Sequence, residues 1–227
     1  MGRPPLDRKT RRAAAQNMIH SAEQLIEEDG IGHVTIRKIA NRADVNSAAL
    51  YHYFTDVDEL LLFACMDIMR LISENVDEVK AQTEDTDPMT RYTRVWEVLC
   101  SDGFRNPELT SHVLFGKHSE DIERIVRKYL TIFPAPEHED DEEPDPERMK
   151  SLINHFDFRS DVRQETAGAM NRDVDDPHVE IVTELMMGYY RMLLGELAQD
   201  RGNSLSAEEQ TEKMLKAAKY LMQKPIS

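Results

Sequence analysis

The sequence predicts an all-α protein with about nine to ten helices, in which an N-terminal three-helix helix-turn-helix domain precedes a larger helical domain. Three observations predict this class. Apolar residues recur at spacings of three and four along most of the chain, which is the helical period. Four prolines directly follow an Asp or Asn, while alternating, β-branched runs of the kind that form strands are nearly absent.

The Asx-Pro pairs mark helix starts. An Asp or Asn before a helix accepts an N–H that the first turn leaves unpaired, and Pro at the first helical position lacks such an N–H. Capping boxes with a Glu three residues after an Asp or Ser predict two more starts. The expected starts are Asp87-Pro88, Asn106-Pro107, Asp145-Pro146, Asp176-Pro177, Asp56-x-x-Glu59 and Ser206-x-x-Glu209.

The first 54 residues hold three predicted helices, at about 11–29, 35–43 and 47–54. The first has an apolar stripe at helical spacing, and the other two share a small apolar core. Between the second and third helices, Asp44 is expected to adopt a positive φ, which Gly tolerates best and Asp or Asn next. These elements rest on Ala15, Met18, Ala22 and Leu25 in the stripe and on Ile36, Ile39, Ala40, Val45, Leu50 and Phe54 in the core.

The third predicted helix has small and polar residues at its start, namely Asn46, Ser47 and Ala48. A helix fits the major groove of DNA, and a small tip allows its backbone to approach the base edges. Tyr51, His52 and Tyr53 cannot all face the core on one helical turn, so at least one of them must lie outside. An exposed aromatic side chain at this position favours a nucleic-acid or ligand surface.

With these features, the chain resembles the TetR family of transcriptional regulators over its first quarter. The resemblance implies that Thr35 and Arg37 contact phosphate, that Asn46, Ser47 and Ala48 approach bases, and that Tyr51, His52 and Tyr53 contact either. It also implies double-stranded operator DNA as a partner. The matching positions are Ala22, Leu25, Gly30, Thr35, Ile39, Ala40, Ala43, Val45, Leu50, Tyr51, Phe54 and Leu60.

The chain departs from the family pattern at the start of the next helix. Val57 occupies a position where the family usually carries a lysine close to phosphate, and Asp44 replaces the commoner Gly. A basic N-terminal arm that includes Arg3 and Arg11 is expected to compensate, with Arg3 entering the minor groove. The alternative for residues 1–7 is a tail without a role in DNA binding.

The charge is divided unevenly along the chain. The whole sequence carries a net −15, yet residues 1–54 have eight basic and six acidic residues and are net positive by two. The remainder therefore carries −17. Phosphate neutralisation dominates nonspecific DNA binding, so the N-terminal part can meet DNA while the rest repels it. The division predicts two domains, residues 1–55 for DNA binding and 56–227 for ligand binding and dimerisation.

The resemblance supplies most of what is expected of residues 56–227. The last two helices, at about 177–200 and 207–223, are expected to pair with their copies in a homodimer. Intrachain packing is the alternative for this amphipathic hairpin. The interface would use Val182, Met186, Tyr189, Leu193, Met214, Ala218 and Leu221.

The middle helices are expected to enclose a pocket for a small, mostly apolar effector. A long helix at about 57–82 would act as a lever from the pocket to the DNA-binding domain. Met and aromatic residues at helical spacing favour such a ligand, although plain core is the alternative for each. The candidates are Met66, Met69, Trp96, Phe104, Phe115, Tyr129 and Phe133.

Other function classes find little support. The sequence contains no catalytic constellation, no metal-ligand spacing and no cofactor motif. It has no apolar run of membrane-spanning length, and Cys65 and Cys100 are expected to be buried thiols in a cytoplasmic protein. The acidic segment 134–147 is expected to be a solvated loop. The favoured hypothesis is a ligand-released repressor. The alternative is a dimeric small-molecule-binding or protein-interaction module with a weakened DNA reader.

Overall fold

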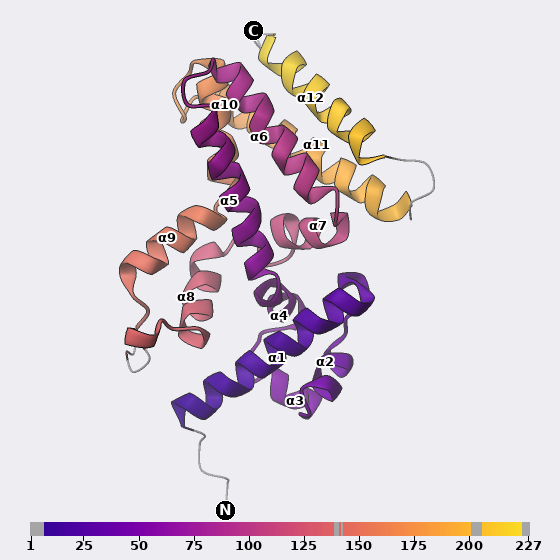
Figure 1. The fold of residues 1–227 in the computed structure, drawn as a ribbon, viewed down its shortest axis with the longest axis vertical. Coiled ribbons are helices and arrows are strands. Elements are labelled where there is room, and N and C mark those ends of the chain that lie inside the picture. Colours follow the sequence, from indigo (N-terminus) through magenta and orange to yellow (C-terminus); the bar gives the residue numbers. More distant parts are fainter. Residues whose placement is uncertain (1–6, 139–140, 142, 201–205, 224–227) are drawn as a thin grey trace, which may run out of the picture. The chain divides into compact units, whose positions relative to one another are not determined.

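The computed structural model describes residues 7–138, 141, 143–200 and 206–223, and within these ranges the chain forms helices and no strand (Figure 1). The predicted all-α class is confirmed, with two more α-helices than the upper expectation. Two 3₁₀ segments, Ile31–His33 and Pro136–His138, accompany them. The α-helices are α1 Arg8–Asp29, α2 Ile36–Arg42, α3 Ser47–Leu50, α4 Val57–Ala64, α5 Met66–Gln82, α6 Pro88–Gly103, α7 Pro107–Phe115, α8 Ile122–Ile132, α9 Pro146–Phe156, α10 Phe158–Met170, α11 Pro177–Asp200 and α12 Ala207–Gln223.

All four Asx-Pro pairs start helices, at Pro88, Pro107, Pro146 and Pro177. Asp87 shows the expected chemistry, since its Oδ1 accepts a hydrogen bond from the Thr90 N–H at 3.0 Å. These starts could be read from the sequence because a cap depends only on residues within one turn of each other.

The predicted lever at 57–82 is interrupted, and the expectation of one continuous helix is wrong. The helix ends at Ala64, and Cys65 separates α4 from α5 with φ −99° and ψ 1°. The Cys65 N–H shares its hydrogen bond between the carbonyl oxygens of Leu61 and Leu62, both at 3.1 Å, which tightens the last turn. Residues 59–66 are all buried, so packing on every side decides the geometry here, rather than one amphipathic face.

Two compact units make up the chain. Unit 1 contains residues 1–67 and 116–156, and unit 2 contains residues 68–115 and 157–227. The predicted boundary after residue 55 divides the chain by function and stays a prediction. The compact units divide it differently, because residues 116–156 pack with the N-terminal helices.

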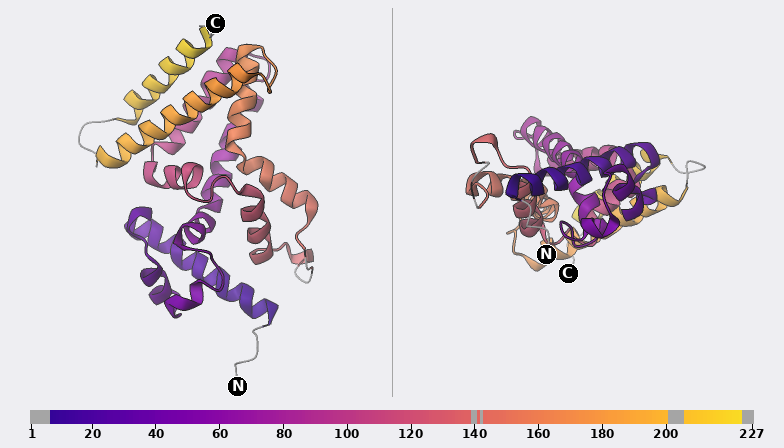
Figure 2. Two further views of the ribbon diagram at one scale, coloured as in Figure 1. Left: turned by 180° about the vertical axis from the view of Figure 1, so that it is seen from behind. Right: turned by 90° about the horizontal axis from the view of Figure 1, so that it is seen from below.

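Unit 2 has an aromatic core around one tyrosine. Tyr190 on α11 packs against Trp96 on α6 and against Phe104, the residue that follows α6. The ring centroids of these two residues lie 5.6 and 5.5 Å from that of Tyr190. Its hydroxyl donates a 2.6 Å hydrogen bond to the Leu99 carbonyl oxygen, which satisfies the polar end of a buried ring. Within this unit α12 lies along α6 and α11 (Figures 1 and 2).

Candidate nucleic-acid interface

The core of α1, α2 and α3 forms as predicted. Ala15, Met18, Ala22 and Leu25 are all buried and present one face of α1. Ile39, Ala40, Leu50 and Phe54 are buried against it, whereas Ile36 and Val45 remain partly exposed. A small apolar core of this kind holds two short helices that have too few residues to be stable alone.

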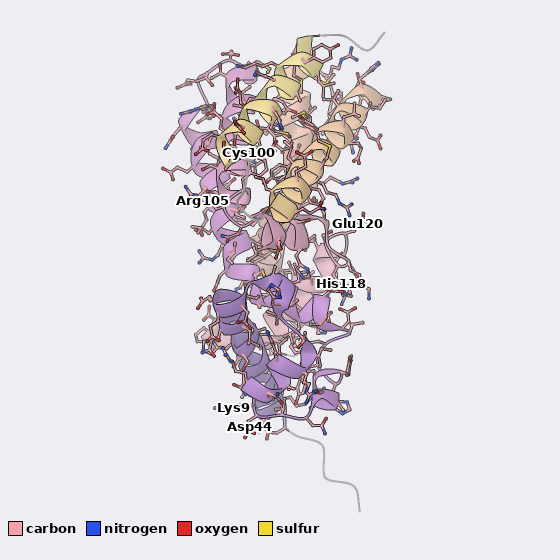
Figure 3. All side chains as sticks on the ribbon, turned by 90° about the vertical axis from the view of Figure 1, so that its right-hand side faces the viewer. Lys9, Asp44, Cys100, Arg105, His118 and Glu120 are labelled. Carbon is pink, nitrogen blue, oxygen red and sulfur yellow. The ribbon has the colours of Figure 1, made fainter. Side chains whose placement is uncertain are left out.

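The turn between α2 and α3 contains the predicted positive φ. Asp44, labelled in Figure 3, has φ 54°, and the following Val45 N–H bonds to the Ala40 carbonyl oxygen at 2.9 Å. The Asn17 side chain on α1 donates to the Ala43 carbonyl oxygen at 2.9 Å. This bond satisfies a carbonyl at the end of α2 and ties the turn to α1.

The recognition helix is shorter than predicted. It covers Ser47–Leu50 and is followed by a turn at residues 51–53, so the expectation of a helix to residue 54 is wrong. The Tyr53 and Phe54 N–H groups both bond to the Leu50 carbonyl oxygen, at 2.9 and 2.8 Å, which closes the helix. The Asn46 side chain caps its start by accepting from the Ala48 N–H at 2.9 Å. The side-chain amide oxygen of Asn46 is used in this bond, while its NH₂ group can still donate hydrogen bonds.

Several predicted contact residues lie on the surface. Tyr51 is 59% exposed and His52 is also exposed, while Tyr53 is half-buried beside Phe54. Thr35 and Arg37 at the start of α2 are exposed as well. The predicted outward position of at least one aromatic side chain is therefore confirmed, but its contact with DNA stays a prediction.

The neighbouring cations of α2 are paired, in contrast to Arg37. Lys38 Nζ lies 2.6 Å from Asp29 Oδ2, and Arg42 makes two hydrogen bonds to Glu28. Exposed pairs of this kind add little to stability. They nevertheless fix the direction of α2 against the end of α1.

The basic arm is only partly described. Arg3 lies outside the described residues, and α1 begins with Arg8. Arg8 donates to the Asp141 carbonyl oxygen, and Arg12 Nε donates to the Thr131 carbonyl oxygen at 2.9 Å. Arg11 and Lys9 are exposed on the first turns of α1, and Lys9 is labelled in Figure 3. The compensation for Val57 by this arm stays a prediction.

A charge cluster at the start of α4 joins this helix to residues 116–156. Glu59 is 0% exposed, and its two carboxylate oxygens accept from Arg124 at 2.5 Å and Lys128 at 2.7 Å. It also accepts from the Thr55 N–H at 2.6 Å, one residue before the position expected for a capping box. The local sequence identifies Glu59 only as a helix-start residue, because its partners Arg124 and Lys128 lie more than 60 residues away.

The other acidic residue of this start, Asp56, has three partners. Its side chain caps α4 through the Glu59 N–H at 2.9 Å, and it pairs with Lys117 at 2.6 Å and His118 at 3.0 Å. Lys117 thus brings a cation from outside α4 to this end of the helix, while the local Val57 is half-buried. Burial alone would raise the pKa of Asp56, but the bonds from Lys117, the Glu59 N–H and His118 lower it below its ordinary value.

The pKa of Glu59 is shifted in the same direction. Burial opposes the charge of this carboxylate, but hydrogen bonds from Lys128, the Thr55 N–H and Arg124 lower its pKa below the ordinary value. Both carboxylates are therefore ionised in the folded protein at neutral pH. They hold the start of α4 against α8 and the segment before it.

The helices α1 to α3 form a helix-turn-helix arrangement, with Tyr51 and His52 beside α3 exposed. Residues 18–63 match the family of bacterial regulatory proteins called the tetR family. The resemblance to the TetR family is thus confirmed, and the N-terminal segment carries it.

Two curated relatives each match over a part of the chain. The HTH-type transcriptional regulator BetI of Stenotrophomonas maltophilia (strain R551-3) is 36% identical over 70 residues. The HTH-type nicotine-responsive transcriptional repressor HdnoR of Paenarthrobacter nicotinovorans is 30% identical over 70 residues. Each match spans 31% of this chain and 36% of the relative, so the chain is matched to little more than a third of each relative's length.

Solved structures extend the likeness of fold to nearly the whole chain. The Thermus thermophilus FadR repressor, a TetR-family protein in complex with lauroyl-CoA, gives a TM-score of 0.56 at 17% identity over 94% of this chain and 97% of that chain. RolR in complex with resorcinol gives a TM-score of 0.52 at 16% identity over 96% of this chain and 97% of that chain. At these identities the likeness establishes the fold alone.

The predicted pocket residues are divided between the two units. Met66, Tyr129 and Phe133 belong to unit 1, where Tyr129 lies 4.9 Å from Phe133 and 6.3 Å from Phe63 between ring centroids. The others belong to unit 2, where Trp96 and Phe104 lie in the core, Phe115 packs against it and Met69 is buried. The effector pocket stays a prediction.

The predicted dimer residues require a correction. Val182, Met186, Leu193, Met214 and Ala218 are each 0% exposed, so they form the core between the helices of one chain and cannot present a surface to a second copy. Tyr189 and Leu221 are partly buried against the same core. The exposed apolar residues of this hairpin are instead Ile181, Leu185, Met192 and Tyr220. Both faces of α11 are apolar, so periodicity alone could not separate them.

The two cysteines are free and buried, as predicted. Burial raises the pKa of Cys65 to about 12, and that of Cys100 is raised for the same reason, so neither is a reactive thiolate. In the described part of the chain, no three His, Cys, Asp or Glu residues are grouped to hold a metal ion. No described helix is long and apolar enough to cross a membrane.

Proposed function

We propose that the chain is a homodimeric transcriptional regulator, a repressor that binds double-stranded operator DNA and is released by a small, mostly apolar effector. The observation that carries the DNA-binding part is the exposed set Arg37, Tyr51 and His52 around a small-tipped recognition helix. Arginine and tyrosine on such a surface suit phosphate, and Asn46 to Ala48 suit the base edges. DNA binding places the protein in the cytoplasm.

A second copy fits the exposed face of α11. Ile181, Leu185 and Met192 follow one another at spacings of four and seven, which places them on one side of the helix with Gly188 between them. Tyr220 adds an exposed aromatic ring on α12. An apolar, self-complementary face suits an isologous dimer, and a dimer can engage two half-sites about one turn of DNA apart.

The effector is proposed from composition and from the relatives. One curated relative is a nicotine-responsive repressor, and the two solved structures contain lauroyl-CoA and resorcinol. The aromatic core of unit 2 favours an apolar or aromatic molecule here as well. Such a molecule releases DNA only if it binds the DNA-free conformation more tightly than the DNA-bound one.

The deciding experiment is a gel shift of the full chain on the DNA upstream of its own gene, at low salt. The expected result is a discrete shifted band that competitor DNA of unrelated sequence does not remove. Arg37→Ala should abolish the band, whereas Arg105→Ala, which removes an exposed arginine from unit 2, should not. The absence of a shift with any promoter-length probe would favour the alternative, a dimeric ligand-binding or protein-interaction module whose helix-turn-helix domain binds DNA only weakly.

A further inference from the structure

A cleft in unit 1 brings basic side chains from two distant parts of the sequence to one place. It has a volume of about 680 Å³, within the range of small-molecule sites, which is about 300–1,000 Å³. Its walls come from the start of α1, the turn after α3 and the end of α8. The lining residues are Arg8, Arg11, Arg12, Ala15, His52, Tyr53, Lys128, Thr131 and Ile132. We call this the basic cleft.

The charge of the basic cleft is of one sign. Three arginines and one lysine line it, and none of its described lining residues is acidic. Two arginines of unit 2 that could have held an anion are paired with carboxylates instead. Arg91 makes two 2.8 Å bonds to Glu165, and Arg94 lies 2.6 Å from Glu97. Anion binding is therefore favoured in the basic cleft rather than at these positions.

The first turn of α1 adds positive charge to the basic cleft, and the Asp7 carboxylate caps this turn by accepting from the Thr10 N–H at 2.9 Å. This turn contains basic residues and no acidic one, although the positive end of a helix dipole disfavours cations. Like charges placed around one hollow repel one another, and an anion between them relieves that repulsion.

Three of the four cations are held by hydrogen bonds. Arg8 donates to the Asp141 carbonyl oxygen. Arg12 Nε is held by the Thr131 carbonyl oxygen at 2.9 Å, and Lys128 Nζ by Glu59 at 2.7 Å. Because these side chains are already held in place, they lose less conformational entropy when a ligand binds. Arg11, which also lines the cleft, is exposed.

The floor of the basic cleft is apolar. Ala15 and Ile132 are buried, and the half-buried Tyr53 provides an aromatic wall. A bare phosphate or a hydrated DNA backbone would use the basic rim and leave this floor unused. A molecule with an anionic head and an apolar body would use both.

We propose that the basic cleft binds a small organic anion, a carboxylate or phosphate ester with an apolar or aromatic body. Because His52 and Tyr53 line the cleft and also belong to the proposed DNA-contacting set, the bound anion competes with DNA for the same side chains. This competition rests on the proposed function, whereas anion binding does not. Unit 1, which contains the proposed DNA-contacting residues, would then respond directly to a ligand of its own.

The test is isothermal titration calorimetry of the full chain with phenyl phosphate at constant ionic strength. Inorganic phosphate tests the anion without the apolar body, and benzyl alcohol tests an aromatic body without the charge. We expect phenyl phosphate to bind at least about tenfold more tightly than either. Arg11→Gln should weaken phenyl phosphate about tenfold through loss of a charge-assisted bond. Lys9→Gln is the matched control, since Lys9 is an exposed cation on the same turn that does not line the cleft.

Methyl NMR locates the site. Phenyl phosphate should shift the Ala15 and Ile132 methyl signals, with Ile132→Val confirming the assignment. Binding without these shifts, equal loss with Lys9→Gln, or equal affinity for inorganic phosphate overturns the proposal.

DNA competition separates the two proposals. Phenyl phosphate should raise the midpoint of binding to the upstream DNA in a fluorescence anisotropy titration, and inorganic phosphate at the same ionic strength should not. If the DNA does not bind at all, the proposed function fails while the calorimetry still judges the cleft. If DNA binds but phenyl phosphate does not bind, the cleft proposal alone fails.

Discussion

Lys128 Nζ lies 2.7 Å from Glu59 Oε2, so a cation from α8 pairs with a fully buried carboxylate of α4 across 69 residues of sequence. Arg124 lies 2.5 Å from the other oxygen of the same carboxylate. The pair explains why residues 116–156 belong with the N-terminal helices in one compact unit. These contacts connect α8 to the start of α4, which follows the turn after α3.

Glu59→Gln should lower the free energy of unfolding by about 3 kcal/mol, because it removes one partner of a buried charge cluster. Chemical denaturation with urea checks this. The exposed Glu208→Gln on α12 is the control and should change it little. An equal change in both variants would mean that the cluster does not stabilise the unit.

The same cluster sets an acid limit on stability. The pKa values of Glu59 and Asp56 are lowered on folding, so the unfolded state binds more protons and stability rises with pH. Their contribution is fully present above the ordinary carboxyl pKa of 4.5 for Glu59 and 3.8 for Asp56, and is lost as the pH falls through the lowered values. Urea midpoints measured from pH 6 to pH 3 should fall less steeply in Glu59→Gln than in the unaltered chain. Parallel curves would contradict this assignment.

The turn at Asp44 should respond to β-branching. Its φ of 54° lies in the left-handed region, where a β-branched residue is strained. Asp44→Val should therefore destabilise the protein by about 1–2 kcal/mol, while Asp44→Gly and Asp44→Asn should be tolerated. Thermal unfolding followed by circular dichroism measures the difference. A tolerated valine would show that the turn adopts another conformation in solution.

Tyr51 should matter for DNA and not for folding. Its ring is 59% exposed, so Tyr51→Ala should leave the thermal midpoint within a few degrees, as expected of a surface substitution. DNA affinity, measured by anisotropy on the upstream probe, should fall at least about tenfold, which is the loss of one good contact. Leu50→Ala serves as the contrast, since Leu50 is buried and its truncation should lower the midpoint. If Tyr51→Ala unfolds the protein, the ring belongs to the core.

The exposed face of α11 predicts the oligomeric state. Leu185→Glu should convert the dimer to a folded monomer in sedimentation velocity, because it places a charge in an apolar interface. Leu71→Glu on α5 is the matched control, since Leu71 is exposed to a similar degree, 55% against 50%. A dimer that persists in Leu185→Glu would exclude this face.

Gly103 and Tyr190 should be energetically coupled. A Cβ added at Gly103 would lie 1.9 Å from the Tyr190 hydroxyl oxygen and 3.1 Å from its ring carbon, so Gly103→Ala requires the tyrosine to move. Tyr190→Phe removes the hydroxyl and its bond to Leu99, at about 1–2 kcal/mol. The double variant should be more stable than the sum of the two single losses predicts. Additive losses in urea unfolding would show that the clash is relieved elsewhere.

The sequence by itself determined the local features. The four Asx-Pro starts, the positive φ at Asp44 and the burial of the α1 stripe all depend on residues within a few turns of each other. The motif around the recognition helix sufficed for the family resemblance, since its order and spacing are fixed by one compact element.

Only the tertiary structure decided which charges and faces meet. Glu59 is bonded to Arg124 and Lys128, and nothing in the local sequence marks partners more than 60 residues away. Both faces of α11 are apolar, so the choice between the buried Met186 and the exposed Leu185 depends on which side the other helices of unit 2 cover. Local patterns fix helices because their hydrogen bonds and caps are local, while burial is a property of the packed unit as a whole.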